Sequence, residues 1–235
     1  MKIAISGKGG VGKTTFAAFL IKSLQLKGKS VLAIDSDPDA NLAQALGARN
    51  ASEITPISEM KSLIEERTET KIGTMGNLFK MNPKVSDLPE KLSIDVDGVK
   101  LMVLGGVKAA EGGCICPQSV LLKVLVSHLI LARNEVVVLD MEAGLEHLGR
   151  GTAAAVDTLI VVVHPTIAAM RAAERIAKLA GDLGIEDARF LGNQVTTKGE
   201  GQLLRNRFRE GQILGLLPRY SELREDGVLS GPSGE

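Results

Sequence analysis

The sequence predicts an α/β protein with a mainly parallel sheet that is flanked by helices on both faces. Three observations predict this class. Short apolar segments recur along the chain, amphipathic segments at helical spacing separate them, and glycines or aspartates follow several of them. Buried parallel strands have this near-continuous apolar character. With 44% hydrophobic residues in a chain of 235, there is enough apolar surface for a core, and we expect residues 1–235 to form a single domain.

The first elements are a strand, a glycine-rich loop and a helix. The apolar residues 2–5 read as a buried strand, and residues 15–26 place large apolar side chains at helical spacing. Residues 30–34 form a second apolar run and lead into an acidic loop. Residues 52–89 are polar, contain prolines and show little periodicity, so we expect helices and irregular loops there.

One antiparallel hairpin interrupts this alternation. Asp97-Gly98 separates apolar residues 92–96 from residues 99–104, and an Asp-Gly pair between two such runs is a strong hairpin signal. We expect the second arm to join the main sheet. The remaining expected elements are helices at 118–132, 168–183 and 201–208, and strands at 135–139, 158–163, 189–192 and 212–217.

The loop after the first strand carries the most specific motif. The spacing Gly7-x4-Gly12-Lys13-Thr14 matches the phosphate-binding loop, or P-loop. The alternative is a glycine-rich turn that binds nothing, and the strand before the loop and the helix after it argue against that alternative. Glycines let consecutive N–H groups point at one phosphate, Lys13 adds a positive charge, and the Thr14 hydroxyl can bind Mg2+. The predicted nucleotide-binding residues of the loop are Gly9, Gly10, Val11, Gly12, Lys13, Thr14 and Thr15. The sequence therefore predicts a P-loop NTPase fold.

Aspartates follow two of the predicted strands. We expect Thr14, Asp37 and Asp140 to hold Mg2+, and Asp37 also to orient or activate the attacking water. Asp35 would support Asp37 through the metal shell, and Gly144 would let a backbone amide approach the terminal phosphate. A solvated carboxylate at a strand end is the alternative for each aspartate. The convergence of three loops at one sheet edge favours the hydrolytic site.

Lys8 is one lysine more than the P-loop pattern requires. With it, the chain resembles the P-loop ATPases that carry a second, signature lysine (a deviant Walker A motif), which include MinD, ParA, the nitrogenase iron protein and ArsA. The resemblance implies hydrolysis of ATP to ADP and phosphate and ATP-dependent homodimerisation, with Lys8 reaching the phosphates bound by the partner. It also implies that Asn193 and Pro218 contact the adenine. A solvated loop lysine is the alternative for Lys8.

The two cysteines, Cys114 and Cys116, indicate a branch of this group. Their segment, residues 111–117, and residues 140–152 resemble CooC-type ATPases, which are associated with nickel insertion into carbon monoxide dehydrogenase. Two thiolates fill half of a four-coordinate shell, so a two-fold axis would complete a site for one Ni2+ or Zn2+ between protomers. A shared [4Fe–4S] cluster and a pair of buried cysteines that only fill space are the alternatives.

The net charge of the chain gives no reason to expect nucleic acid or a membrane as a partner. Lys and Arg total 28, as do Asp and Glu, which gives no field favouring nucleic acid or an acidic membrane. No apolar run approaches the length of a bilayer span and no signal sequence is recognised, so a cytoplasmic protein is expected. A MinD/ParA-like ATPase that organises a partner, DNA or a membrane, with incidental cysteines, is the competing function; the acidic, glycine-rich residues 221–235 disfavour it. A third possible function is that of a metal chaperone that uses ATP only as a structural ligand. The sequence leaves open the metal, the client, and the roles of Glu142 and His147.

Overall fold

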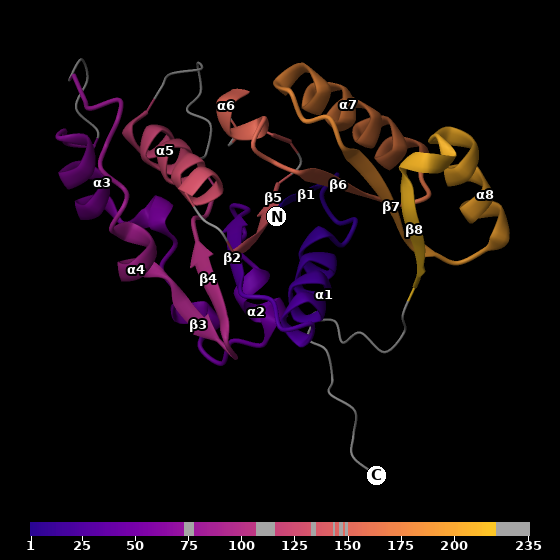
Figure 1. Cartoon of the computed structure of the whole chain (residues 1–235), viewed down its shortest axis with the longest axis horizontal. Coiled ribbons are helices and arrows are strands. Elements are labelled where there is room, and N and C mark those ends of the chain that lie inside the picture. Colours follow the sequence, from indigo (N-terminus) through magenta and orange to yellow (C-terminus); the bar gives the residue numbers. More distant parts are fainter. Residues whose placement is uncertain are drawn as a thin grey trace, which may run out of the picture.

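The computed structural model describes residues 1–72, 78–106, 116–132, 135–142, 144–145, 148 and 150–219. Within them, one eight-stranded sheet runs through the molecule in the order β3-β4-β2-β5-β1-β6-β7-β8 (Figure 1). Its strands are β1 (Lys2–Ser6), β2 (Val31–Ser36), β3 (Ile94–Val96), β4 (Val99–Val103), β5 (Val136–Met141), β6 (Thr158–Val163), β7 (Ala188–Val195) and β8 (Ile213–Pro218). Every neighbouring pair is parallel except β3 and β4. The predicted fold class is confirmed.

Helices cover both faces of the sheet. Figure 1 shows α1 and α2 on one side of it, and α5, α6 and α7 on the other. The α-helices are α1 (Lys13–Leu26), α2 (Leu42–Leu46), α3 (Lys61–Thr68), α4 (Leu88–Leu92), α5 (Pro117–Ala132), α6 (Arg150–Ala153), α7 (Ile167–Leu183) and α8 (Lys198–Arg207). Within the described parts of the chain, no helix is both long and apolar enough to cross a bilayer.

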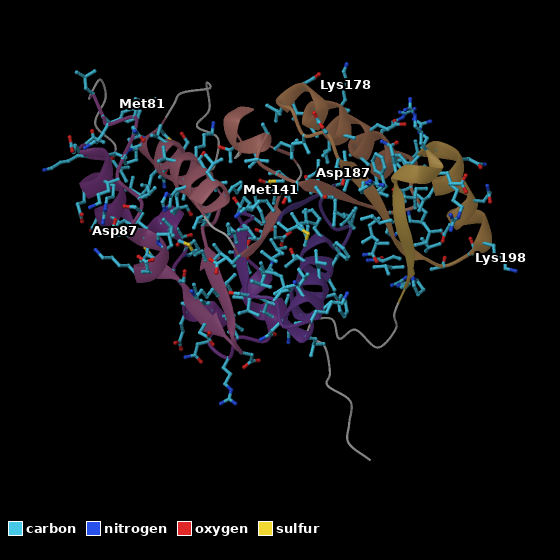
Figure 2. All side chains as sticks on the ribbon, viewed as in Figure 1. Met81, Asp87, Met141, Lys178, Asp187 and Lys198 are labelled. Carbon is cyan, nitrogen blue, oxygen red and sulfur yellow. The ribbon has the colours of Figure 1, made fainter. Side chains whose placement is uncertain are left out.

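The core lies between these layers and consists largely of strand side chains. Met141, at the end of β5, is fully buried near the centre of the molecule, whereas Lys178 and Lys198 lie at the periphery (Figure 2). Strand β2 is buried at all six positions, as expected for a strand with neighbours on both sides and helices on both faces. The buried centre fixes the ends of β1, β2 and β5, from which the functional loops emerge.

The predicted hairpin is present. Asp97 and Gly98 have φ values of 50° and 82°, the left-handed backbone at both central positions that a type I′ turn requires. The turn sets the antiparallel register, with Val96 opposite Val99. Strand β4 then pairs in parallel with β2, so the second arm joins the main sheet as expected.

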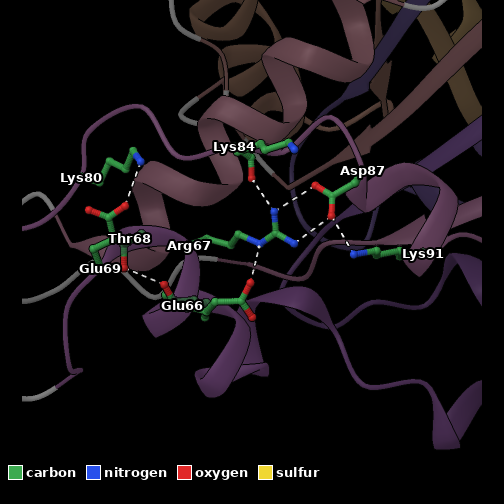
Figure 3. A network of polar contacts seen from close by, with 9 residues as sticks. Glu66, Arg67, Thr68, Glu69, Lys80, Lys84, Asp87 and Lys91 are labelled. Atoms are coloured by element: carbon green, nitrogen blue, oxygen red, sulfur yellow. Dashed lines mark hydrogen bonds and ion pairs between the residues drawn. The ribbon is translucent and has the colours of Figure 1, made fainter.

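In its described residues, 52–72 and 78–89, the polar region consists of short helices and loops, as predicted. Two 3-10 helices, Ala51–Glu53 and Ile57–Glu59, precede α3 and α4. Figure 3 shows the ion-pair network that joins α3 to the start of α4: Arg67 donates two hydrogen bonds to Asp87, at 2.9 and 2.8 Å. Lys91 forms a further ion pair with Asp87 at 2.9 Å. The region therefore has its own electrostatic connections, apart from the sheet.

Candidate functional site

The P-loop connects β1 to α1 and has the backbone of a phosphate cradle. Gly7, Gly10 and Gly12 have φ values of 153°, 79° and 89°, which favour glycine. A β-carbon on Gly7 would lie 2.3 Å from the carbonyl oxygen of Val162, so packing against β6 also excludes a side chain there. Helix α1 begins at Lys13, two residues before the predicted start, and its N-terminus adjoins the loop. Anions are stabilised at this position.

Lys13 and Asp37 come together across this site. The Lys13 Nζ lies 4.0 Å from Asp37 Oδ2, and the two side chains are 7% and 17% exposed. The other Asp37 oxygen, Oδ1, accepts the N–H of Asp39 at 3.0 Å and so shapes the acidic loop. Lys8, on the P-loop itself, is exposed. The Asp37 oxygen nearest Lys13 thus lies beside the P-loop, where a terminal phosphate would bind.

Asp35 has a different position from the one expected. Strand β2 continues through Ser36, so Asp35 belongs to the strand and lies opposite Asp140 on β5. Its Oδ1 accepts the N–H of Asp37 at 3.1 Å, and its Oδ2 accepts that of Leu42 at 2.8 Å. Burial raises the pKa of Asp35 to about 6, and the backbone donors oppose that rise. Since an amide already occupies each oxygen, Asp35 fixes the acidic loop from its two ends.

Asp140 has a buried carboxyl group without a hydrogen-bond partner among the described residues. Its side chain is fully buried, and neither carboxyl oxygen completes a hydrogen bond within the described chain. Burial, more than any other influence, raises the pKa of Asp140 to about 7, although the neighbouring Thr14 hydroxyl opposes the shift. Buried carboxylates are normally paired or bound to a metal. A buried carboxylate beside a hydroxyl provides oxygen donors that fit Mg2+, which keeps part of its water shell and takes the rest from carboxylates and phosphate.

Ser6 holds the loop that follows Asp140, and sequence reasoning missed it. Its buried hydroxyl lies 3.1 Å from the carbonyl oxygens of both Glu142 and Gly144, to which it can donate. It also accepts the N–H of Gly144 at 3.3 Å. Gly144 has a φ of 156°, a value that a residue with a side chain rarely adopts. The position of Ser6, at the end of a strand and directly before the P-loop, was the available signal.

The two predicted adenine contacts lie at the ends of β7 and β8. Asn193 Nδ2 donates to the carbonyl oxygen of Val11 at 2.9 Å, so this side chain reaches the P-loop itself. The pairing of β7 with β8 is irregular between Gly192 and Val195, and Val195 lies opposite Pro218. Asn193 and Pro218 both belong to the strand ends on the P-loop side of the sheet.

The predicted thiolate site is only partly described. Cys116 is partly buried directly before α5, where its Sγ accepts the N–H of Ser119 at 3.4 Å and its carbonyl oxygen accepts the Ser119 hydroxyl at 2.8 Å. Cys114 and His147 lie outside the described residues, as do residues 221–235. Among the described residues no group of three or more His, Cys, Asp and Glu side chains is placed to hold a metal. The protein's one described thiol is thus fixed at the start of a helix.

The comparisons with known proteins agree with this geometry. The sequence profile of the family described as CobQ/CobB/MinD/ParA nucleotide binding domain matches residues 2–228. The chain belongs to this family. It is an ATPase of the P-loop type.

Two similar proteins cover nearly the whole chain. An ATP-binding protein of Methanocaldococcus jannaschii is 44% identical, over 99% of this chain and 90% of its own length. The carbon monoxide dehydrogenase accessory protein CooC of Rhodospirillum rubrum is 43% identical, over 95% of this chain and 86% of its own. The expected resemblance to CooC-type ATPases is therefore confirmed.

Solved structures support the fold. A ParA family ATPase of Chlorobium tepidum covers 94% of this chain, and this chain 86% of it, with a TM-score of 0.65 and 18% identity. The septum site-determining protein MinD of Pyrococcus horikoshii, solved with Mg-ADP, gives 0.64 and 19% over 96% and 84%. At these identities the likeness establishes the arrangement of elements.

Proposed function

We propose that this chain is a homodimerising ATPase that binds Ni2+ or Zn2+ through Cys114 and Cys116 and assists nickel insertion into carbon monoxide dehydrogenase. The observation that carries the proposal is the 43% identity to CooC over 95% of the chain. MinD of Bacillus subtilis is 28% identical over 82% of the chain and 64% of its own length. This difference in similarity favours a function in nickel insertion over that of a MinD/ParA-like ATPase that organises a partner, DNA or a membrane.

In the proposed reaction, the P-loop amides and Lys13 bind the outer phosphates of ATP. Asp37 orients a water, whose oxygen attacks the terminal phosphorus while the bond to the ADP oxygen breaks, giving ADP and phosphate. Thr14, Asp37 and Asp140 would hold Mg2+, which neutralises charge on the phosphate oxygens when bound. The 4.0 Å separation of Lys13 and Asp37 supports these roles, because both groups then border the same phosphate position.

Two further contributions come from the ends of other elements. Exposed Lys8 would reach the phosphates of the partner protomer, where a positive charge stabilises the transition state as an arginine finger does. Asn193 and Pro218 would contact the adenine at the ends of β7 and β8. The contact of Asn193 with Val11 supports this role, since it brings the amide to the nucleotide loop.

The metal site would use the two-fold axis of the dimer. Cys114 and Cys116 of each protomer give four sulfurs, the number that tetrahedral Zn2+ accepts, while Ni2+ prefers a flatter arrangement. The position of Cys116 at the start of α5 supports the proposal, because its main chain and sulfur are fixed by Ser119. Nickel bound here is cargo for the client enzyme.

Metal analysis combined with native mass measurement tests the proposal. The chain contains two cysteines, so Cys114→Ser/Cys116→Ser removes every thiol. We expect one Zn2+ or Ni2+ per wild-type dimer, more dimer with ATP, and loss of the metal in the double variant with ATP hydrolysis retained. A double variant that keeps its metal would refute the thiolate site. Wild-type protein that stays monomeric with ATP and metal would refute the dimer.

A further inference from the structure

The side-chain amide of Asn193 contacts the P-loop from a distant strand. Strand β7, which carries Asn193, is separated by β6 from β1, the strand that leads into the loop (Figure 1). Asn193 Nδ2 nevertheless donates to the carbonyl oxygen of Val11 at 2.9 Å. Because a carbonyl oxygen only accepts hydrogen bonds, the NH2 end of the amide, and not its oxygen, faces the loop.

The Val11 carbonyl lies where the P-loop becomes helix α1. The first backbone hydrogen bond of this helix runs from the N–H of Phe16 to the carbonyl oxygen of Gly12, at 3.0 Å. The Val11 carbonyl thus lies one residue before that series, and Val11 is only 3% exposed. A buried carbonyl group needs a hydrogen bond to offset the loss of water. Asn193 provides one from outside the loop.

This hydrogen bond also fixes the direction of a backbone N–H group. The Val11 carbonyl and the Gly12 N–H belong to the same peptide unit, and no peptide bond in the described residues is cis. In a planar trans peptide the C=O and N–H bonds point in opposite directions. With the carbonyl held by Asn193, the Gly12 N–H points away from Asn193. At the start of α1, N–H groups of a P-loop face phosphate.

Gly12 has two structural reasons to be glycine, and Asn193 supplies one of them. Its φ of 89° lies in the left-handed region, which favours glycine. A β-carbon on Gly12 would also lie 2.5 Å from Asn193 Nδ2. The amide of Asn193 therefore occupies the space that a side chain at this position of the P-loop would need.

A contact between two strand ends supports the segment that carries Asn193. Val163 and Gly192 lie opposite each other in the pairing of β6 with β7. The next residues on the two strands are His164 and Asn193. Gln194 follows with a φ of 56°, which is uncommon for a residue with a side chain, and its Oε1 lies 3.1 Å from Nε2 of His164. Such backbone conformations persist where surrounding contacts hold them.

We infer that Asn193 is a positioning residue of the ATPase, which holds the Val11–Gly12 peptide with the Gly12 N–H directed at phosphate. The inference rests on the part of the proposed function in which the P-loop amides bind phosphate, and it adds a role to the adenine contact proposed for Asn193. Donors that are fixed in advance stabilise charge without having to reorient. The metal at the cysteines has no part in this role.

Tripolyphosphate separates this role from contact with the base, because it has three linked phosphates and no adenine. Calorimetry measures the affinities of Mg2+–tripolyphosphate and of a non-hydrolysable ATP analogue with Mg2+ for wild type, Asn193→Ala and Asn206→Ala. The control removes the same side chain from the exposed face of α8, where Asn206 contacts Gln202. We expect Asn193→Ala to bind tripolyphosphate about 10-fold more weakly than wild type, as for loss of one hydrogen bond to a charged group. Asn206→Ala should bind it as tightly as wild type.

Asn193→Leu is a second variant, in case Asn193→Ala does not fold. Leucine has the same branching as asparagine and adds no charge, but it cannot donate to Val11, so we expect the same loss of tripolyphosphate affinity. Wild-type affinity for tripolyphosphate in either folded variant, with only the ATP analogue weakened, would show that Asn193 acts on the base alone and would overturn the inference. An equal loss in Asn206→Ala would also overturn it.

The wild-type protein gives the remaining outcomes. Wild type that binds the ATP analogue but not tripolyphosphate would show that the P-loop does not hold phosphate by itself, which overturns the inference and leaves the ATP site intact. Wild type that binds neither ligand would overturn the proposed phosphate site as well.

Discussion

Two aspartates of this chain, Asp140 at the end of β5 and Asp87 at the start of α4, lie in opposite environments. Asp140 is fully buried with no hydrogen-bond partner among the described residues, and burial raises its pKa to about 7. The guanidinium of Arg67, aided by Lys91, holds the pKa of Asp87 well below its usual range. The charge of Asp87 is balanced by ion pairs within the protein, whereas the carboxyl group of Asp140 has no partner among the described residues and is open to a ligand. This difference is the one expected between a structural ion pair and the proposed Mg2+–ATP site.

Asp140→Asn gives the largest effect that this comparison predicts. The amide keeps the shape of the side chain but removes the charge that would bind Mg2+, so ATP hydrolysis should fall by about 100- to 1,000-fold, as when one stabilising group of an active site is lost. Stability without nucleotide should stay the same or rise, because an unpaired buried carboxyl group is removed. Steady-state kinetics and chemical unfolding measure the two effects. A large loss of stability would show that Asp140 serves the fold.

Ser6→Ala tests the support of the loop after Asp140. It removes the hydroxyl that can donate to the carbonyl oxygens of Glu142 and Gly144, while the Gly144 N–H keeps its shorter hydrogen bond to the Glu142 carbonyl oxygen, at 2.8 Å. We expect the loss of a hydrogen bond, about 0.5–1.5 kcal/mol in unfolding free energy, together with slower ATP hydrolysis. Urea denaturation measures the first. Ser30→Ala, at an exposed hydroxyl that contacts Glu135, is the control and should change neither; equal losses in both variants would remove the case for Ser6.

Asp87→Asn should change stability but not ATP hydrolysis, the opposite of the effects expected for Asp140→Asn. Because the folded pKa of Asp87 lies below its ordinary value of 3.8, its ion pairs contribute stability above that pH and lose it as the pH falls toward the folded value. Wild type should therefore lose more stability than the variant between about pH 5 and pH 3, while ATP hydrolysis at neutral pH stays unchanged. Unfolding curves across this range measure the difference. Parallel curves would show that the ion pair contributes nothing.

Lys91→Ala should have the smallest effect. The Lys91 side chain is 63% exposed, and exposed ion pairs contribute about 0.2–1 kcal/mol. Since Arg67 also binds Asp87 through two hydrogen bonds, we expect a loss at the lower end of that range, which decreases further with added salt. Thermal unfolding at two salt concentrations measures it. A loss of several kcal/mol would show that Lys91, not Arg67, dominates this network.

Local patterns predicted the fold and the P-loop because both depend on neighbours in sequence. The glycines of the P-loop, the Asp97-Gly98 turn and the apolar strands each have a signature a few residues long. Three strands continue by two or more residues beyond their predicted ends: β2, β5 and β7. Asp35 and Asp140 belong to β2 and β5 because they lie opposite each other in the sheet, a pairing between residues far apart in the chain. Taken from the sequence alone, these two aspartates were assigned to loops because they are polar and follow apolar runs.

The missed parts of the site are long-range contacts of polar side chains. Ser6 is 136 residues from Glu142, and Asn193 is 182 residues from Val11. Such contacts follow from the fold and leave no periodic pattern in the sequence.

The most direct test of the central claim is the stabilisation by Mg2+ of wild type and Asp140→Asn in the presence of a non-hydrolysable ATP analogue. A ligand at 100 times its dissociation constant adds about 2.7 kcal/mol to the free energy of unfolding. With the analogue present, we predict that Mg2+ raises the unfolding temperature of wild type and leaves that of Asp140→Asn unchanged. An equal rise in both proteins would contradict the assignment of Asp140 to the Mg2+–ATP site.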